Sequence, residues 1–179
     1  MTVSFIDPAA ECLVEANAYG LHVDLSGAAK IGLVINRIVD CDRFMSEIGA
    51  ALKLARPDLE IISYDTGTIT FADASLMERV ASDCDAAVCA IGHCGSCTAG
   101  TVKDTIALIE HGIPAVALVT EVFQEQAAAL ALSLGWPDAP RVQLPYPVWG
   151  TEQASMQRVA SIAADEVLAC LEAESDKTA

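Results

Sequence analysis

The sequence predicts an α/β protein whose core is a doubly wound, open parallel sheet of five strands. From Lys30 onward, short apolar runs rich in β-branched residues alternate with longer segments that carry apolar residues at helical spacing. Residues that favour turns separate these segments, for example the pairs His111-Gly112 and Trp136-Pro137. This alternation is typical of parallel strands that are joined by helical crossovers.

The order of the strands follows from the handedness of these connections. Right-handed crossovers leave few strand orders, and a flavodoxin-like order 2-1-3-4-5 fits best. Strands are expected at residues 31–35, 60–64, 86–91, 115–119 and 142–144, and helices at 41–54, 74–82, 98–110, 123–134 and 152–172. Residues 1–29 have weak periodicity and predict a short N-terminal arm with one helix at 9–18. Residues 30–179 are expected to be one domain, since no linker divides them.

Composition and charge exclude several classes of function. The chain has 179 residues, of which 53% are hydrophobic and 20% charged, as is typical of a folded globular domain. With 10 Lys and Arg against 25 Asp and Glu, its formal charge of −15 repels nucleic acid and anionic membrane surfaces. No apolar run reaches the roughly 20 residues of a spanning helix, and the N-terminus lacks a signal-peptide pattern. We therefore expect a cytoplasmic protein with a small-molecule substrate and no nucleic-acid or membrane partner.

The seven cysteines are the most informative feature of the composition. In a chain expected in the cytoplasm, an odd number of cysteines argues against a disulfide framework. Most of them resemble small core residues: Cys89 lies inside an apolar run, and Cys170 lies on the apolar side of the last expected helix. Cys94 and Cys97 differ, because they stand in the polar, glycine-rich loop that follows the third strand.

This loop reads GHCGSCT at residues 92–98 and lies at the carboxyl end of the expected sheet, where doubly wound folds bind ligands. Two thiols at C-x-x-C spacing approach each other when the second begins a helix, and free N–H groups at the helix start stabilise a thiolate. One thiol would be the nucleophile and the other would resolve the adduct. His93 could assist proton transfer, Gly95 lets a ligand approach the backbone, and Ser96 or Thr98 could cap the helix. No metal is expected, because a zinc site needs further ligands that the sequence does not supply.

Three other loops bring polar or aromatic residues to the same edge of the sheet. Asn36 and Arg37 follow the first strand, and an arginine there suits a carboxylate, which indicates an acidic substrate. Thr120 and Glu121 end the fourth strand, where they either contact substrate or cap the next helix and compensate its dipole. Tyr146 lies in the proline-rich turn after the fifth strand and could form a pocket wall or a subunit contact.

Several ordered motifs in this chain resemble the UGSC-like family, whose name comes from a selenocysteine-Gly-Ser-Cys motif. They are CGSCT at 94–98, GIP at 112–114, VTEVF at 119–123, GWP at 135–137 and LPYP at 144–147, and the resemblance runs from about residue 30 to residue 152. The chain is also distantly similar to the selenoprotein B subunits of glycine and D-proline reductases.

The family resemblance assigns different roles to the two cysteines of the motif. It implies that Cys94 stands where the family carries selenocysteine or cysteine, so Cys94 would be the nucleophile and Cys97 the resolving thiol. The family pattern has a further cysteine and a histidine where this chain has Gly100 and Lys103. That difference argues against a relay of several thiols.

We therefore predict a thiol-dependent enzyme, an oxidoreductase that reduces or reductively cleaves a small acidic molecule. The expected catalytic residues are Cys94, Cys97 and His93, and the expected substrate-binding residues are Asn36, Arg37, Gly95, Ser96, Thr98, Thr120, Glu121 and Tyr146. No bound cofactor is expected, and an external thiol could donate electrons. Two alternatives stay open: a non-redox hydrolase, lyase or isomerase with a cysteine nucleophile, and a non-catalytic subunit of a larger complex. We expect a homo-oligomer or a subunit of a hetero-oligomer.

Overall fold

The five strands form one parallel sheet in the order β2-β1-β3-β4-β5, which confirms the predicted flavodoxin-like order. The structure is a computed structural model, and it describes residues 14–173. Each strand differs from its expected range by one residue at one end: β1 (Lys30–Ile35), β2 (Glu60–Asp65), β3 (Ala86–Gly92), β4 (Ala115–Thr120) and β5 (Arg141–Leu144). β1 pairs with both β2 and β3. The chain therefore places β2 on one side of β1 and all later strands on the other side.

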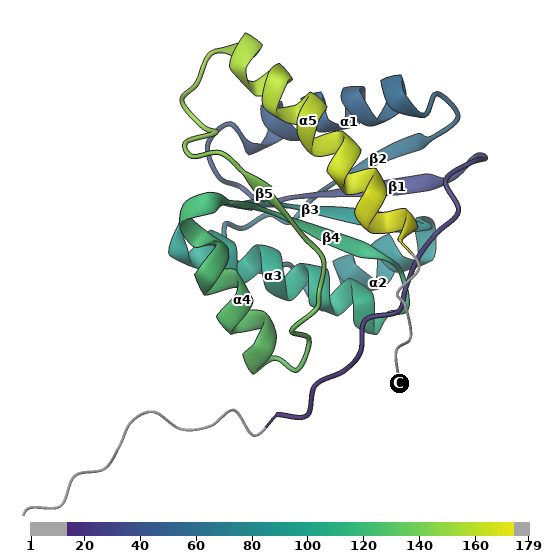
Figure 1. Ribbon diagram of the computed structural model, residues 1–179, viewed down its shortest axis with the longest axis vertical. Coiled ribbons are helices and arrows are strands. Elements are labelled where there is room, and N and C mark those ends of the chain that lie inside the picture. Colours follow the sequence, from purple (N-terminus) through teal and green to yellow (C-terminus); the bar gives the residue numbers. More distant parts are fainter. Residues whose placement is uncertain (1–13, 174–179) are drawn as a thin grey trace, which may run out of the picture.

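Helices cover both faces of this sheet, as Figure 1 shows: α1 and α5 lie on one face, and α2, α3 and α4 lie on the other. Their bounds are α1 (Cys41–Ala55), α2 (Ala74–Asp83), α3 (Gly95–Glu110), α4 (Gln124–Ser133) and α5 (Gln153–Glu172). Every residue of β3 and β4 is buried, which is why these strands read as continuous apolar runs. Within residues 14–173, no helix has the length and apolar character that crossing a membrane requires.

The ends of the helices agree with the predicted turn chemistry except at two starts. Gly112 and Gly135, after α3 and α4, have φ angles of 86° and 81°, which glycine adopts without strain. However, α3 begins at Gly95, three residues earlier than expected. The fourth helix is also preceded by a separate 3-10 turn, Glu121–Phe123.

The N-terminal arm has no helix in its described part. The helix expected at 9–18 falls partly on residues 9–13, which lie outside the described residues, and residues 14–18 are not helical. The backbone N–H of Asn17 donates to the carbonyl of Gly135 at 2.7 Å, and that of Val23 donates to the carbonyl of Leu171 at 2.9 Å. The bond from Asn17 satisfies a backbone group that the expected helix would pair locally, and both bonds are long-range contacts that hold the arm in its observed conformation.

Candidate functional site

The C-x-x-C loop joins β3 to α3, and Cys94 is the residue that caps α3. The sulfur of Cys94 accepts a hydrogen bond from the backbone N–H of Cys97 at 3.3 Å and lies 3.5 Å from the hydroxyl oxygen of Ser96. Ser96 and Thr98 lie inside the helix, so the expectation that one of them caps it is wrong. A cysteine sulfur is not among the usual capping groups, and for this reason the sequence placed the helix start too late.

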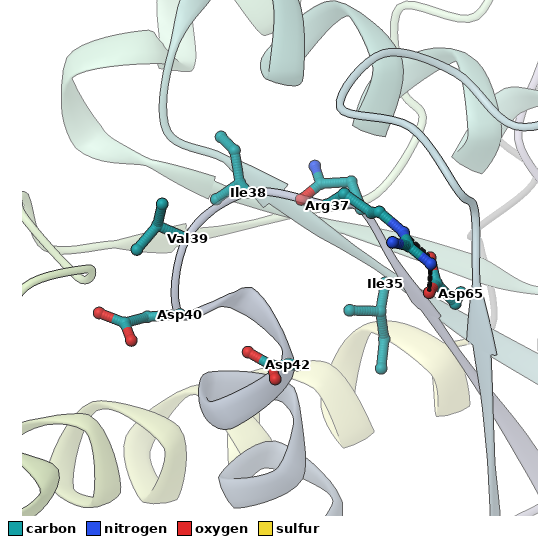
Figure 2. A pocket seen from close by; sticks show the side chains of 8 residues that line it. Ile35, Arg37, Ile38, Val39, Asp40, Asp42 and Asp65 are labelled. Atoms are coloured by element: carbon teal, nitrogen blue, oxygen red, sulfur yellow. Dashed lines mark hydrogen bonds and ion pairs between the residues drawn. The ribbon is translucent and has the colours of Figure 1, made fainter.

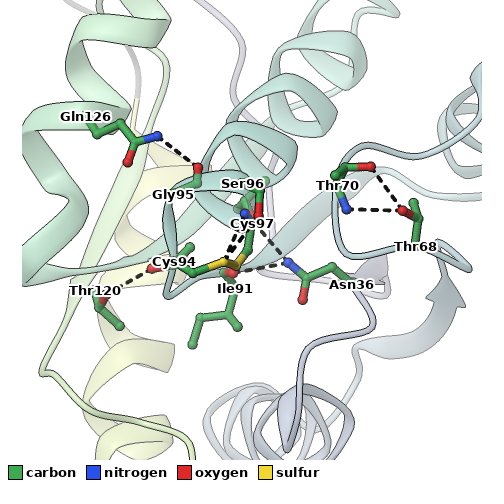
Figure 3. Close-up of a disulfide and its surroundings, with 12 residues drawn as sticks. Asn36, Thr68, Thr70, Ile91, Cys94, Gly95, Ser96, Cys97, Thr120 and Gln126 are labelled. Atoms are coloured by element: carbon green, nitrogen blue, oxygen red, sulfur yellow. Dashed lines mark hydrogen bonds between the residues drawn. A yellow bond between two sulfur atoms is a disulfide. The ribbon is translucent and has the colours of Figure 1, made fainter.

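Cys94 and Cys97 form a disulfide in this structure (Figure 3), with their Cα atoms 5.3 Å apart. Cys94 is partly exposed, whereas Cys97 is fully buried. A reactant from solvent therefore meets the sulfur of Cys94 and not that of Cys97. A nucleophile and a resolving thiol need this asymmetry, and the pair is compatible with a redox thiol role.

The other described cysteines lie in environments that suppress thiol reactivity. Burial raises the pKa of the Cys41 thiol to about 12, and burial also raises the pKa values of Cys84, Cys89 and Cys170. These four thiols stay protonated near neutral pH, and a protonated thiol is a poor nucleophile. The structure thus agrees with the prediction that Cys89 is a core residue.

Neighbouring elements fix the backbone around the disulfide. The hydroxyl of Thr120, at the end of β4, donates to the carbonyl of Gly92 at 2.9 Å, and the side-chain amide of Gln126 in α4 donates to the carbonyl of Gly95 at 2.8 Å. Figure 3 shows both bonds on the same side of the motif. Thr120 stands at the N-cap position of the 3-10 turn Glu121–Phe123, but its side chain makes no capping hydrogen bond and supports the C-x-x-C loop instead. Sequence analysis did not identify Gln126 as a site residue, because no local pattern relates it to the loop residue Gly95, which is 31 positions away.

Polar atoms without partners gather around this loop. Asn36 is buried, and its side-chain N–H₂ donates to the carbonyl of Ile91 at 3.1 Å and to the hydroxyl of Thr101 at 3.4 Å. Among the described residues, four side chains have a buried polar atom with no hydrogen-bond partner: Tyr19, Asn36, His93 and Thr98. Three of the four were predicted from the sequence as site residues. Unpaired buried polar atoms are costly, so the presence of three of them in or beside the C-x-x-C loop makes this loop the candidate functional site.

Arg37 is engaged by another side chain. Its guanidinium donates to both carboxylate oxygens of Asp65, at 3.1 and 2.7 Å (Figure 2), beside a hollow of about 370 Å³ at the carboxyl end of β1. Asp40 is the N-cap residue of α1, and Asp42 lies in the first turn of that helix. In folds of this order, a helix start beside the first strand can bind a nucleotide phosphate such as that of a flavin mononucleotide. Two carboxylates repel such an anion, so these residues do not fit a nucleotide phosphate.

His93 and Glu121 bind the segment that follows β5. The Nε2 atom of buried His93 accepts the backbone N–H of Val148 at 3.0 Å, and its ring stacks on Trp149 with 3.9 Å between centroids. A carboxylate oxygen of Glu121 accepts the backbone N–H of Tyr146 at 3.3 Å. The Tyr146 ring lies 4.6 Å from the His93 ring. His93 is therefore held by backbone and aromatic contacts, and its predicted role in proton transfer stays a prediction.

Gly100 has a steric role in α3. A Cβ atom at position 100 would overlap the backbone carbonyl of Thr70, which lies in the loop after β2. With this loop in place, no side chain can occupy position 100. Position 100 is therefore a close contact between α3 and the neighbouring loop.

Asp104 is a buried carboxylic acid whose environment the sequence did not reveal. It lies in α3, where it is buried and accepts the backbone N–H of Ala72 at 2.8 Å. Burial raises its pKa to about 7.

Within residues 14–173, no cluster of three or more His, Cys, Asp or Glu side chains could hold a metal ion.

Comparison with known proteins places this chain in a family. The UGSC family model matches residues 5–173, so the chain belongs to the UGSC family. The match extends beyond the predicted range of about 30–152 at both ends and includes most of the arm. The more distant similarity to selenoprotein B subunits stays a prediction.

Several solved structures are similar to this chain. A diflavin flavoprotein A3 from Nostoc sp. has 11% identity and a TM-score of 0.43, and the match covers 79% of this chain and 92% of that one. A flavodoxin-like domain from Synechococcus sp. has 10% identity and a TM-score of 0.42, with 78% and 96% covered. An azoreductase from Bacillus anthracis str. Sterne has 8% identity and a TM-score of 0.43, with 77% and 99% covered. No match was found among curated proteins.

Proposed function

We propose that the protein is a thiol-dependent reductase in which Cys94 attacks a small electrophilic substrate and Cys97 resolves the adduct. The observation that carries this proposal is the disulfide itself: a partly exposed sulfur at the start of a helix, joined to a fully buried one. The two sulfurs are close enough to alternate between dithiol and disulfide.

The chemistry balances with one substrate and one external reductant. The Cys94 thiolate attacks a substrate R–Y, forms a Cys94–S–R bond, and releases Y, which takes up a proton. The Cys97 thiolate then attacks the sulfur of Cys94, and R leaves with the bonding electron pair and is protonated to R–H. The dithiol has lost two electrons, and an external dithiol restores them by reducing the disulfide. R must therefore be a stabilised leaving group, such as a carbon next to a carbonyl group, which delocalises the electron pair as an enolate.

The Cys94 thiolate is favoured by its position. The backbone N–H of Cys97 points at its sulfur, and the unpaired N–H groups of the first helical turn carry partial positive charge. None of the ion pairs in the described part of the chain involves a residue of the 92–98 loop. The helix start is therefore the main local support for negative charge at Cys94.

The substrate class proposed from Arg37 is a small acid. Because Asp65 occupies the guanidinium, substrate would have to replace Asp65. Both side chains are well exposed, at 62% and 55%, and exposed ion pairs contribute about 1 kcal/mol or less, so this exchange costs little. A substrate carboxylate could then take the same two-bond geometry.

An aromatic disulfide, dithionitrobenzoate, tests the assignment of the two thiols. We expect the reduced protein to release two equivalents of thionitrobenzoate at the motif: one when Cys94 attacks, and one when Cys97 resolves the mixed disulfide. Cys97→Ser should release one equivalent at the motif and keep the adduct on Cys94, as shown by peptide mass spectrometry. Cys170→Ser is the matched control, because it removes a free, partly buried thiol of α5 that is not part of the motif. If Cys97→Ser also releases two equivalents there, Cys97 is not the resolving thiol.

A pair of probes with different charge tests Arg37. Arg37→Gln should slow the reaction of Cys94 with anionic dithionitrobenzoate by up to about fivefold, and should not affect neutral dithiodipyridine. Arg56→Gln, which breaks an ion pair with Glu172, serves as the charge-matched control. Equal rates for both probes in the Arg37 variant would remove the argument for an acidic substrate.

A further inference from the structure

A segment of seven residues after β5, residues 145–151, lies across the carboxyl end of the sheet, and we call it the strap. Three of its backbone N–H groups, at alternate positions, donate to side chains from three different loops. Tyr146 donates to Glu121, Val148 donates to His93, and Gly150 donates to an oxygen of Asp40 at 2.9 Å. The acceptors follow β4, β3 and β1, so the strap connects the loops after three strands, and one of them is the loop that carries Cys94.

The central anchor requires one protonation state of histidine. Nε2 of His93 accepts the N–H of Val148, so it carries no proton, and the proton of the neutral ring is on Nδ1. A second proton, on Nε2, would place the N–H of the ring against the backbone N–H of Val148, and two donors repel each other. His93 is only 1% exposed, and no other residue of the described chain accepts a hydrogen bond from Nδ1, so burial disfavours an imidazolium at this position. A contact of the ring with the backbone of His93 itself raises the pKa of His93, but by less than burial lowers it.

We propose that His93 is a positioning residue that latches the strap when neutral and releases it when protonated. The latch goes beyond the proposed thiol chemistry, because it concerns the cover of the site. When the strap is latched, Tyr146 packs against His93, the residue that precedes Cys94, and edge-on against Phe123 at 6.4 Å. Release removes this aromatic wall from the Cys94 loop and widens access to the disulfide.

The surroundings of His93 favour the neutral form. Burial lowers the pKa of His93 below its usual value of 6.5. The groups facing the ring are the aromatic side chains of Tyr146 and Trp149, and no ion pair within residues 14–173 involves it. The carboxylates that share the strap are Glu121 and Asp40, and the hydrogen bond from Gly150 together with Arg43 lowers the pKa of Asp40.

The latch makes a quantitative prediction about pH. The open strap lets His93 titrate near its ordinary pKa of about 6.5, whereas the latched strap requires a lower one. Between these two values, the opening constant rises about tenfold for each unit by which the pH falls. Above pH 7 the strap should stay latched, because both states then hold neutral histidine.

Hydrogen exchange of residues 145–151, corrected for the intrinsic pH dependence of exchange, measures this opening. We expect protection of the Val148 amide to fall as the pH is lowered from 7.5 to 5. His93→Gln places an oxygen near the position of Nε2 and does not titrate, so its protection should not depend on pH. His111→Gln, at an exposed helix end, should behave like the wild type. A wild-type profile without pH dependence, or a transition that persists in His93→Gln, would overturn the latch.

Access to the disulfide is the second measurement. The rate at which a phosphine reduces Cys94–Cys97 is compared between wild type and His93→Gln at each pH, so that the pH dependence of the phosphine cancels. We expect a ratio near one at pH 7.5 and a faster wild type at pH 5. A ratio near one at both values would show that the strap does not limit access. Trp149 emission in a Trp136→Phe background reports whether each variant keeps the stacked ring.

Discussion

Asp104 offers the sharpest test of how burial sets charge in this fold. Its carboxyl group lies in α3 with 4% exposure, and its pKa is raised from 3.8 to about 7. The folded protein therefore favours the neutral carboxyl, and the unfolded chain ionises at lower pH. The stabilising contribution of the neutral form is complete below pH 4 and is lost as the pH rises through 7. A shift of roughly three units corresponds to about 4 kcal/mol of lost stability above pH 8.

Asp104→Asn should remove this loss, because asparagine stays neutral and keeps an oxygen for the N–H of Ala72. The assay is urea unfolding of wild type and variant between pH 5 and pH 9 at constant ionic strength. Because about two units of this shift lie above pH 5, we expect the advantage of the variant over the wild type to grow by about 3 kcal/mol between pH 5 and pH 9. Asp58→Asn, at an exposed position, is the control for the change in net charge. If Asp104→Asn and wild type share one pH profile, the carboxyl is not held neutral by burial.

Two further predictions concern stability. Gly100→Ala should destabilise the protein by about 1–2 kcal/mol in thermal or urea unfolding, since overlap with the Thr70 carbonyl outweighs the gain of about 1 kcal/mol that alanine brings to a helix. A more stable variant would mean that the loop does not rest on Gly100. Asp73→Ala should cost about 1 kcal/mol in the same measurement, because the Asp73 carboxylate caps α2 by accepting the N–H of Ser75 at 2.9 Å. Asp73→Ser should restore most of it, and no difference between the two variants would contradict the capping argument.

The strand order and strand positions could be predicted because they depend on local patterns. Strands buried on both faces need continuous apolar runs, and crossovers of one hand restrict how such strands are ordered. The helix starts were less predictable, as α3 shows, because its cap is the sulfur of Cys94 and no common capping residue. The prediction of a helix in the arm was wrong for a related reason. The backbone groups of the arm pair with the turn at Gly135 and with the end of α5, which are distant in the sequence.

The candidate site was predictable in position and less so in its contacts. The C-x-x-C spacing and its place after a central strand pointed to Cys94 and Cys97 without any structure. The partners of Arg37 and His93 did not follow from the sequence, since Asp65 is 28 residues and Val148 is 55 residues away. Side-chain pairing over such separations depends on how loops from different strands meet.

The sequence by itself therefore determined the class of fold and the placement of the Cys94 and Cys97 pair at the carboxyl edge of the sheet, where we propose that the chemistry takes place. These features depend on spacing and apolar periodicity, which a chain keeps whatever its surroundings. Only the tertiary structure decided which sulfur faces solvent, that Asp104 is buried, and that His93 holds the strap. Exposure, burial and long-range hydrogen bonds are properties of packed neighbours, and the neighbours of each of these residues come from distant parts of the chain.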